Sequence, residues 1–160
     1  MSDFNAEAFL EQTTESAMAT SMTVCPEGEY MARIGSEPGD VTATSIQGKK
    51  DPTKTYVQVT LMWEILDENV KSQLKRETLK VRDRFFVDIG PTTGMLATGP
   101  DVNVTLGSRR TAVGLNTDAP FNIGMMRGAG PCMVKVKNTT DERDKTRKYA
   151  EIDRATPLSR

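Results

Sequence analysis

Two stretches near the middle of the chain alternate regularly between apolar and polar side chains, and this alternation limits the possible folds. In residues 56–66 the apolar positions are Val57, Val59, Leu61, Trp63 and Ile65. In residues 79–89 they are Leu79, Val81, Phe85, Val87 and Ile89, with Asp83 at the remaining position of the series. Successive side chains of a β-strand point to opposite faces, so a period of two predicts two half-buried strands.

The opposite face of the second stretch carries an unusual set of side chains: Lys80, Arg82, Arg84, Phe86 and Asp88. Cations neutralise backbone phosphates, and an exposed aromatic ring provides a surface on which a base can stack. The face therefore predicts a site for single-stranded nucleic acid. Two other interpretations stay open. One is a solvated face on which cations discourage edge-to-edge pairing; the other, for Phe86, is a packing surface beneath the N-terminal helix or in a dimer.

Composition restricts how such a site can work. The 160 residues suffice for one well-buried core and are few for two domains, so we expect a single barrel domain over residues 25–160. The chain has 21 basic and 22 acidic residues, so binding must come from local clusters of cations. No stretch has the length of a membrane span and the N-terminus lacks the layout of a secretory signal, so we expect a cytosolic protein with no membrane partner. Cys25 and Cys132 are expected to be reduced, buried thiols.

The chain has no histidine, and this absence removes much catalytic chemistry. It excludes Ser-His and Cys-His nucleophiles, His-zinc sites and an imidazole base near neutral pH. The carboxylates, lysines, tyrosines and cysteines show no recognisable catalytic or metal-binding spacing, and no Gly-rich phosphate loop is present. We therefore predict a protein that is not an enzyme, with no catalytic residues, no metal and no cofactor.

Residues 1–24 differ from the rest of the chain. A helical stripe runs through Ala6, Phe9, Leu10, Thr13 and Ala17, and Asp3 or Asn5 is placed to cap it. The segment therefore predicts a short helix followed by an extended arm. We favour a leader that docks loosely on its own core, because chain ends are usually poorly fixed. The alternative is an arm that grips a neighbouring subunit and makes a homo-oligomer.

The rest of the chain predicts five strands and one helix. The helix covers residues 104–115, with Asn103 as its cap and Asn116 at its end. The strands cover residues 29–34, 56–66, 79–89, 132–137 and 148–155, and the long loop 35–55 has room for a short edge strand at 41–46. A helix between the third and fourth of five strands is the arrangement of the OB-fold. The predicted fold class is an all-β, five-stranded OB-fold-like Greek-key barrel with an N-terminal helix and arm.

In an OB-fold, ligands lie across strands two and three, between the loops that join strands one to two and four to five. Cations occupy both loops. The first contains Lys49, Lys50 and Lys54, and the second contains Arg143, Lys145 and Arg147. Tyr56 and Tyr149 point outward near strand ends, where a ring either extends a stacking row or packs against the barrel rim. The predicted nucleic-acid-binding residues are Lys49, Lys50, Lys54, Tyr56, Lys80, Arg82, Arg84, Phe86, Lys135, Lys137, Arg147 and Tyr149.

Asp83 interrupts the inward-facing series of its strand. A carboxylate at a core position predicts either a β-bulge or a buried pairing with an arginine such as Arg109 or Arg110. These arginines are alternatively phosphate contacts on the bridging helix. Trp63, in the apolar register of the preceding strand, is predicted to lie in the core.

Four segments of the chain resemble the phage-encoded OB-fold single-stranded-DNA-binding proteins. They are CPEGEYMARI (25–34), NVTLGSRRTAVGLN (103–116), MRGAGPCMVKV (126–136) and YAEI (149–152). The resemblance implies a non-enzymatic coat for single strands in phage DNA replication or recombination, with little sequence preference. It also implies that the protein acts in the cytoplasm of the infected bacterium.

A rival prediction comes from a different class of protein. The near-neutral net charge and the long Ser/Thr/Met-containing arm also fit a virion structural protein, such as a capsid decoration or cement subunit. Its barrel would sit on the shell and its N-terminal arm would clasp neighbouring subunits. A small barrel hosts many functions, so fold alone does not separate the two predictions.

Overall fold

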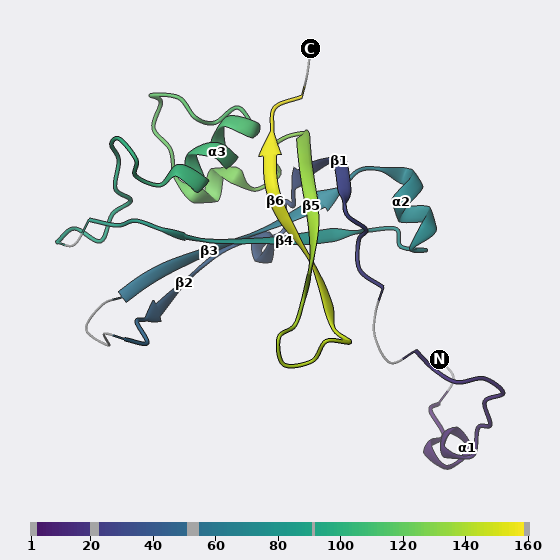
Figure 1. The fold of residues 1–160 in the computed structure, drawn as a ribbon. Helices are drawn as coiled ribbons and strands as arrows, with labels where there is room; N and C mark the ends of the chain where they lie inside the picture. The colour runs from purple at the N-terminus through teal and green to yellow at the C-terminus, as the bar shows by residue number, and fades with distance from the viewer. Residues whose placement is uncertain (1–2, 20–22, 51–54, 91, 159–160) are drawn as a thin grey trace.

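The computed structural model describes residues 3–19, 23–50, 55–90 and 92–158. Within these ranges the chain forms mostly β-structure with few helices (Figure 1). The strands are β1 (Gly28–Ile34), β2 (Val41–Gln47), β3 (Thr55–Ile65), β4 (Lys80–Val87), β5 (Cys132–Thr140) and β6 (Lys148–Thr156). The helices are α1 (Ala6–Leu10), α2 (Glu68–Gln73) and α3 (Val104–Ala112), with two 3₁₀ turns, η1 (Pro38–Asp40) and η2 (Ile123–Met126).

The strands form one sheet that closes into a ring. The sheet order is β1-β5-β6-β4-β3-β2, and an additional pairing between β1 and β3 closes a ring of five strands. All pairings are antiparallel except that of β4 with β6, which is parallel with Arg82 opposite Glu151. β2 lies outside the ring and pairs with β3. The expected all-β, barrel-like fold is therefore confirmed, and β2 is the edge strand for which the long loop had room.

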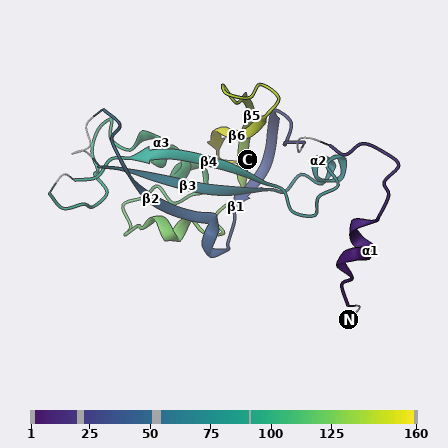
Figure 2. The same ribbon diagram turned by 90° about the horizontal axis from the view of Figure 1, so that it is seen from below.

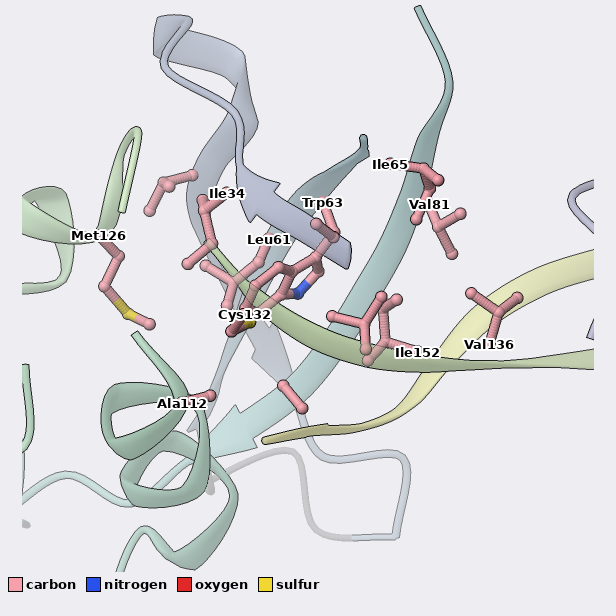
Figure 3. Close-up of a cluster of buried hydrophobic side chains, with 14 of the residues drawn as sticks. Ile34, Leu61, Trp63, Ile65, Val81, Ala112, Met126, Cys132, Val136 and Ile152 are labelled. Carbon is pink, nitrogen blue, oxygen red and sulfur yellow. The ribbon is translucent and has the colours of Figure 1, made fainter. Parts of the chain in front are cut away.

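Alternating side chains of the ring strands fill its interior. Trp63, Ile34, Leu61, Ile65 and Val81 are fully buried, as the period-two pattern predicts (Figure 3). Figure 3 shows Met126 of η2 and Ala112 of α3 at one side of this cluster. Both cysteines are buried and free, as predicted. Burial raises the pKa of each thiol from 9.0 to about 11, because a thiolate is poorly solvated inside the barrel.

Helix α3 begins directly after Asn103, as predicted, but the Asn103 side chain does not cap it and the helix ends before the predicted Asn116. Asn103 precedes the helix in a left-handed conformation, with φ of 51°, and its side chain makes no capping bond to the helix. Its Oδ1 instead accepts a hydrogen bond from the Asp88 backbone N–H. At the other end the helix stops at Ala112, and Gly114, with φ of 77°, follows the last turn in place of the predicted Asn116.

Helix α2, between β3 and β4, was not predicted. Asp67 caps it, because its carboxylate accepts hydrogen bonds from the backbone N–H groups of Asn69 and Val70. Val70 is the one buried residue of the helix. A single buried residue in six leaves no apolar periodicity for a sequence pattern to detect.

The N-terminal segment does not dock on its own barrel in this structure. Helix α1 forms with Asn5 as its cap, as predicted, and Asn5 Oδ1 accepts a hydrogen bond from Ala8 N at 3.1 Å. Residues 3–19 are all exposed, and α1 buries none of its side chains. Figures 1 and 2 show α1 lying apart from the strands. None of the described helices is long and apolar enough to cross a lipid bilayer.

Candidate nucleic-acid interface

The outward side chains of β3 and β4 form a continuous surface. The register places Phe86 opposite Gln58, Arg84 opposite Thr60 and Arg82 opposite Met62. Paired residues of antiparallel strands point to the same face, so these rows lie side by side. We call this surface, together with Tyr56 at its end, the basic-aromatic face; it consists of Tyr56, Gln58, Thr60, Met62, Arg82, Arg84 and Phe86.

Two exposed rings lie together at one end of the basic-aromatic face. Phe86 is 58% exposed and Tyr56 is 46% exposed. Their ring centroids are 6.1 Å apart and the ring planes are inclined at 68°, an edge-to-face pair. Ile46 of β2 is opposite Tyr56 and is also exposed, so it extends the apolar patch. Phe86 is open to solvent. It therefore does not pack beneath the N-terminal helix in this structure, which was one alternative interpretation of this residue.

The two arginines of the basic-aromatic face have no acidic partner among the described residues. Arg84 is exposed and Arg82 is partly buried. The ion pairs found in the described parts of the chain involve neither guanidinium group. Both positive charges are therefore available to an anion from solvent.

Lys80 corrects part of the prediction, because it is already paired. Its Nζ lies 2.9 Å from Asp40 Oδ1 and 3.6 Å from Glu37 Oε2. The hydrogen bond to Asp40 raises the pKa of Lys80, with smaller contributions from the charges of Asp40 and Glu37. Asp40 is buried, so the pair fixes η1 against the start of β4. The strand pattern gave no indication of this contact, since it joins residues forty positions apart.

A hollow of about 290 Å³ lies at the other end of the basic-aromatic face. Met62, Lys80 and Arg82 line it from β3 and β4, and Tyr149 and Ala150 line it from β6. Tyr149 is 36% exposed, and its hydroxyl donates a hydrogen bond to Asp141 Oδ2 at 3.1 Å. The structure thus brings Tyr149 beside Arg82, as the site prediction requires. The sequence did not identify Val24, Cys25, Arg76 and Leu79, which line the rest of the hollow, because no pattern connects them to these strands.

The remaining predicted cations differ in position. Lys49 and Lys50 are exposed beyond the end of β2, Arg147 is exposed before β6, and Lys54 falls outside the described residues. Lys137 is opposite Glu151, which is in turn opposite Arg82, so it belongs to the same cross-strand row as the face. Lys135 is opposite Arg154 and Glu29, which pair with each other at 3.4 Å. Lys135 therefore lies on a mixed-charge surface separate from the basic-aromatic face.

Asp83 lies directly beneath the basic-aromatic face in a buried ion pair. Arg109 Nε donates to Asp83 Oδ2 at 2.7 Å and its Nη2 donates to Oδ1 at 3.2 Å. Trp63 Nε1 donates to the same Oδ2 at 3.0 Å. The predicted buried pairing is confirmed, with Arg109 as the partner. The two-point contact joins α3 to β4 and leaves Arg109 unavailable as a phosphate contact.

Arg110 also has a structural role. Its guanidinium carbon lies 3.9 Å from the centroid of the Phe121 ring, and its Nη2 donates to the Leu115 carbonyl at 3.0 Å. This contact borders a larger cavity, of about 920 Å³, between α3 and the loops at 95–99 and 116–123. The cavity is lined mainly by apolar and uncharged polar residues, and its one arginine is already engaged. It therefore lacks the open cations of the basic-aromatic face.

The chemistry of the basic-aromatic face suits an anionic, ring-bearing polymer. It offers two guanidinium groups without a described acidic partner, amide and hydroxyl groups between them, and exposed rings at one end. Among the described residues no three His, Cys, Asp or Glu side chains lie close enough together to hold a metal ion. Comparison of the chain with protein-family models, curated proteins and solved structures finds no match.

Proposed function

We propose that this protein binds single-stranded DNA without catalysis and with little sequence preference, in phage DNA replication or recombination. One observation carries the proposal: Arg82, Arg84 and Phe86 project together from one sheet face, the ring is open to solvent, and neither arginine is paired with a described carboxylate. Such a face neutralises phosphates and stacks bases without reading base edges. The place of action that follows is the cytoplasm of an infected bacterium.

We further propose that the barrel is an OB-fold. Going round the ring, the order β1-β3-β4-β6-β5 places the first, second, third, fifth and fourth ring strands of the chain side by side. Helix α3 lies between the third and fourth of these strands in sequence. OB-folds bind oligonucleotides across their second and third strands, which would be β3 and β4 here. This assignment supports the function because the basic-aromatic face lies on those two strands.

The expected affinity depends on a few contacts. Stacking contributes roughly 1–3 kcal/mol for each base held by an exposed ring such as Phe86 or Tyr56. Each phosphate neutralised by a cation such as Arg82 or Arg84 contributes about 0.7 to the slope of log affinity against log salt concentration. Lys49, Lys50 and Arg147, at the two ends of the face, would add to this slope. Binding should therefore weaken strongly as salt rises.

The test is fluorescence anisotropy of a labelled oligothymidine at low and at moderate salt. The proposal predicts binding at micromolar protein or below at low salt, with a clear loss of affinity at moderate salt. The double variant Arg82→Gln/Arg84→Gln should lose most of the binding. Arg154→Gln, which removes an exposed arginine from a different part of the barrel, is the matched control. Absence of binding at micromolar wild-type protein in low salt contradicts the proposal.

A second candidate function rests on the exposed apolar side chains of the N-terminal arm. Phe4, Phe9 and Leu10 are 75%, 54% and 80% exposed, so the arm has apolar area to bury on another molecule. A virion decoration or cement subunit would use such an arm to hold its neighbours. Mass spectrometry of purified particles separates the two functions. A replication protein is absent from virions, whereas a cement subunit is present in many copies.

A further inference from the structure

The charges of the chain are segregated between the arm and the barrel. Residues 1–24 contain Asp3, Glu7, Glu11 and Glu15 and no lysine or arginine. Residues 25–160 contain all 21 basic residues and 18 acidic ones. The near-zero net charge of the whole chain therefore conceals an acidic arm attached to a basic barrel. Opposite charges on two parts of one chain attract each other most strongly at low ionic strength.

The arm joins the barrel beside the basic-aromatic face. The Thr23 carbonyl accepts a hydrogen bond from Arg76 Nη2 at 2.9 Å, which fixes the point of attachment. The next two residues, Val24 and Cys25, line the same hollow as Met62 and Arg82. The acidic segment is thus tethered at one end of the row of arginines. The distance along β4 from Arg82 to Phe86 is about 13 Å, at roughly 3.3 Å per residue. An arm of some twenty residues spans this distance easily, even with one short helix in it.

The arm also carries the side chains that an aromatic surface would bind. Phe4 and Phe9 contact each other, with ring centroids 5.5 Å apart, and both remain largely exposed. The barrel offers exposed Tyr56 and Phe86 within reach of the tether. A segment that is joined to its binding surface by a few residues has an effective concentration on the order of millimolar, so even a weak contact is populated within one chain. This argument favours the chain's own arm over the arm of a second copy at micromolar protein.

We infer that residues 3–19 bind the basic-aromatic face of the same chain and compete there with single-stranded DNA. The arm's carboxylates replace phosphates beside Arg82 and Arg84, and its phenylalanines replace bases against Tyr56 and Phe86. The undocked arm seen in the structure is the released state, which leaves the face open. The competition rests on the proposed function, whereas the contact between arm and face does not depend on it.

The contact is tested without DNA by a nitroxide label on the full-length chain. A Ser16→Cys variant places a reactive thiol on the exposed arm, while the buried Cys25 and Cys132, with pKa values of about 11, react slowly. At low salt the label should broaden the amide NMR signals of Arg84 and Phe86 more than those of Thr117 and Asp118, which follow α3 on the opposite side of β4. High salt should restore the signals, and dilution should not. Unchanged signals at low salt overturn the inference, and so does broadening that disappears on dilution, which indicates a second copy's arm.

The competition is tested by neutralising the arm. The triple variant Glu7→Gln/Glu11→Gln/Glu15→Gln keeps the length and helix propensity of the arm and removes three charges. It should bind oligothymidine roughly tenfold more tightly than the wild type at low salt, which corresponds to three weak, exposed ion pairs. The difference should disappear at high salt. The matched control is Glu7→Asp/Glu11→Asp/Glu15→Asp, which keeps the charges and should bind like the wild type.

The outcomes distinguish this inference from the proposed function. Equal oligothymidine affinity of the wild type and the neutral-arm variant at low salt overturns the inference and leaves the proposed function standing. Failure of both proteins to bind oligothymidine overturns the proposed function and the competition. In that case the nitroxide experiment still decides whether the arm contacts the face.

Discussion

Phe85 and Phe86 are neighbours in the sequence, and the pleat of β4 gives them opposite surroundings. Phe85 is 8% exposed and belongs to the core, whereas Phe86 is 58% exposed and faces solvent beside Tyr56. A buried ring contributes to stability through the apolar area it removes from water, and an exposed ring contributes little. An exposed ring beside arginines that pair with no described carboxylate is instead available for binding.

Substitution of these two residues separates binding from folding. We expect Phe86→Ala to weaken oligothymidine binding by roughly 1–3 kcal/mol, because it removes a stacking surface. Its free energy of unfolding should change little, because the ring is largely exposed. Phe85→Ala should lower the free energy of unfolding by about 3–5 kcal/mol. Anisotropy titration and urea denaturation measure the two effects. A Phe86→Ala protein that is destabilised and binds normally would assign Phe86 to a packing role.

The charge of Arg84 makes a separate prediction about salt dependence. Replacing it with glutamine removes one phosphate contact, so affinity should fall for every sequence tested. The slope of log affinity against log salt should become shallower by about 0.7. Lys80→Gln should leave this slope unchanged, since Lys80 is held by Asp40 and Glu37. A salt series of anisotropy titrations tests both variants. Equal slopes for wild type and Arg84→Gln would show that Arg84 contacts no phosphate.

At the scale of single elements, the alternation of apolar and polar residues predicts where the strands lie. Each strand of the ring forms within a few residues of its predicted position. β1, β3, β4 and the first half of β5 bury alternate side chains, whereas β6 buries Ile152 and Ala155, which are three positions apart. Contacts between elements are what the pattern could not supply. Lys80 is paired because η1 brings Asp40 next to the start of β4. The hollow lined by Tyr149 and Arg82 forms because β6 lies parallel to β4. Both depend on tertiary placement and leave no local signal in the chain.

One element contact was predictable from a single residue. A carboxylate at a core position needs a partner, because an unpaired buried charge costs several kcal/mol. Asp83 therefore indicated its pairing before the position of α3 was known. The choice between Arg109 and Arg110 was not predictable. The two side chains point in different directions from α3, and the orientation of the helix on the sheet decides which of them reaches Asp83.

The Asp83–Arg109 pair should be essential to the attachment of α3 to β4. Asp83→Asn keeps the shape of the side chain and leaves Arg109 buried without an opposite charge. We expect a loss of about 3–5 kcal/mol in the free energy of unfolding. Glu64→Gln is the control: Glu64 pairs with the half-exposed Arg33 at 3.4 Å, and its loss should cost at most about 1 kcal/mol. Urea denaturation provides both values, and equal values for the two variants would contradict the structural role given to the buried pair.

For the molecule as a whole, the two buried thiols make the free energy of unfolding decrease at alkaline pH. Cys25 and Cys132 have pKa values near 11 in the folded chain, against 9.0 ordinarily, because burial disfavours the thiolate. Between these values the unfolded chain releases thiol protons that the folded chain keeps. The thiols' contribution to stability is therefore complete below pH 9 and is lost as pH rises toward about 11.

This linkage predicts how a cysteine-free chain differs from the wild type. Cys25→Ala/Cys132→Ala should be less stable near neutral pH, because two buried side chains are shortened. The difference should narrow as pH rises above 9, by roughly 1 kcal/mol per thiol at pH 10, since only the wild type has thiols to ionise on unfolding. Burial raises the pKa of Tyr30 and the charge of Cys25 raises it further, so Cys132→Ala measured alone gives the pH dependence of one thiol without this coupling. Urea denaturation of both proteins at several pH values between neutrality and pH 10 measures the gap. A gap that stays constant over this pH range would contradict the raised thiol pKa values.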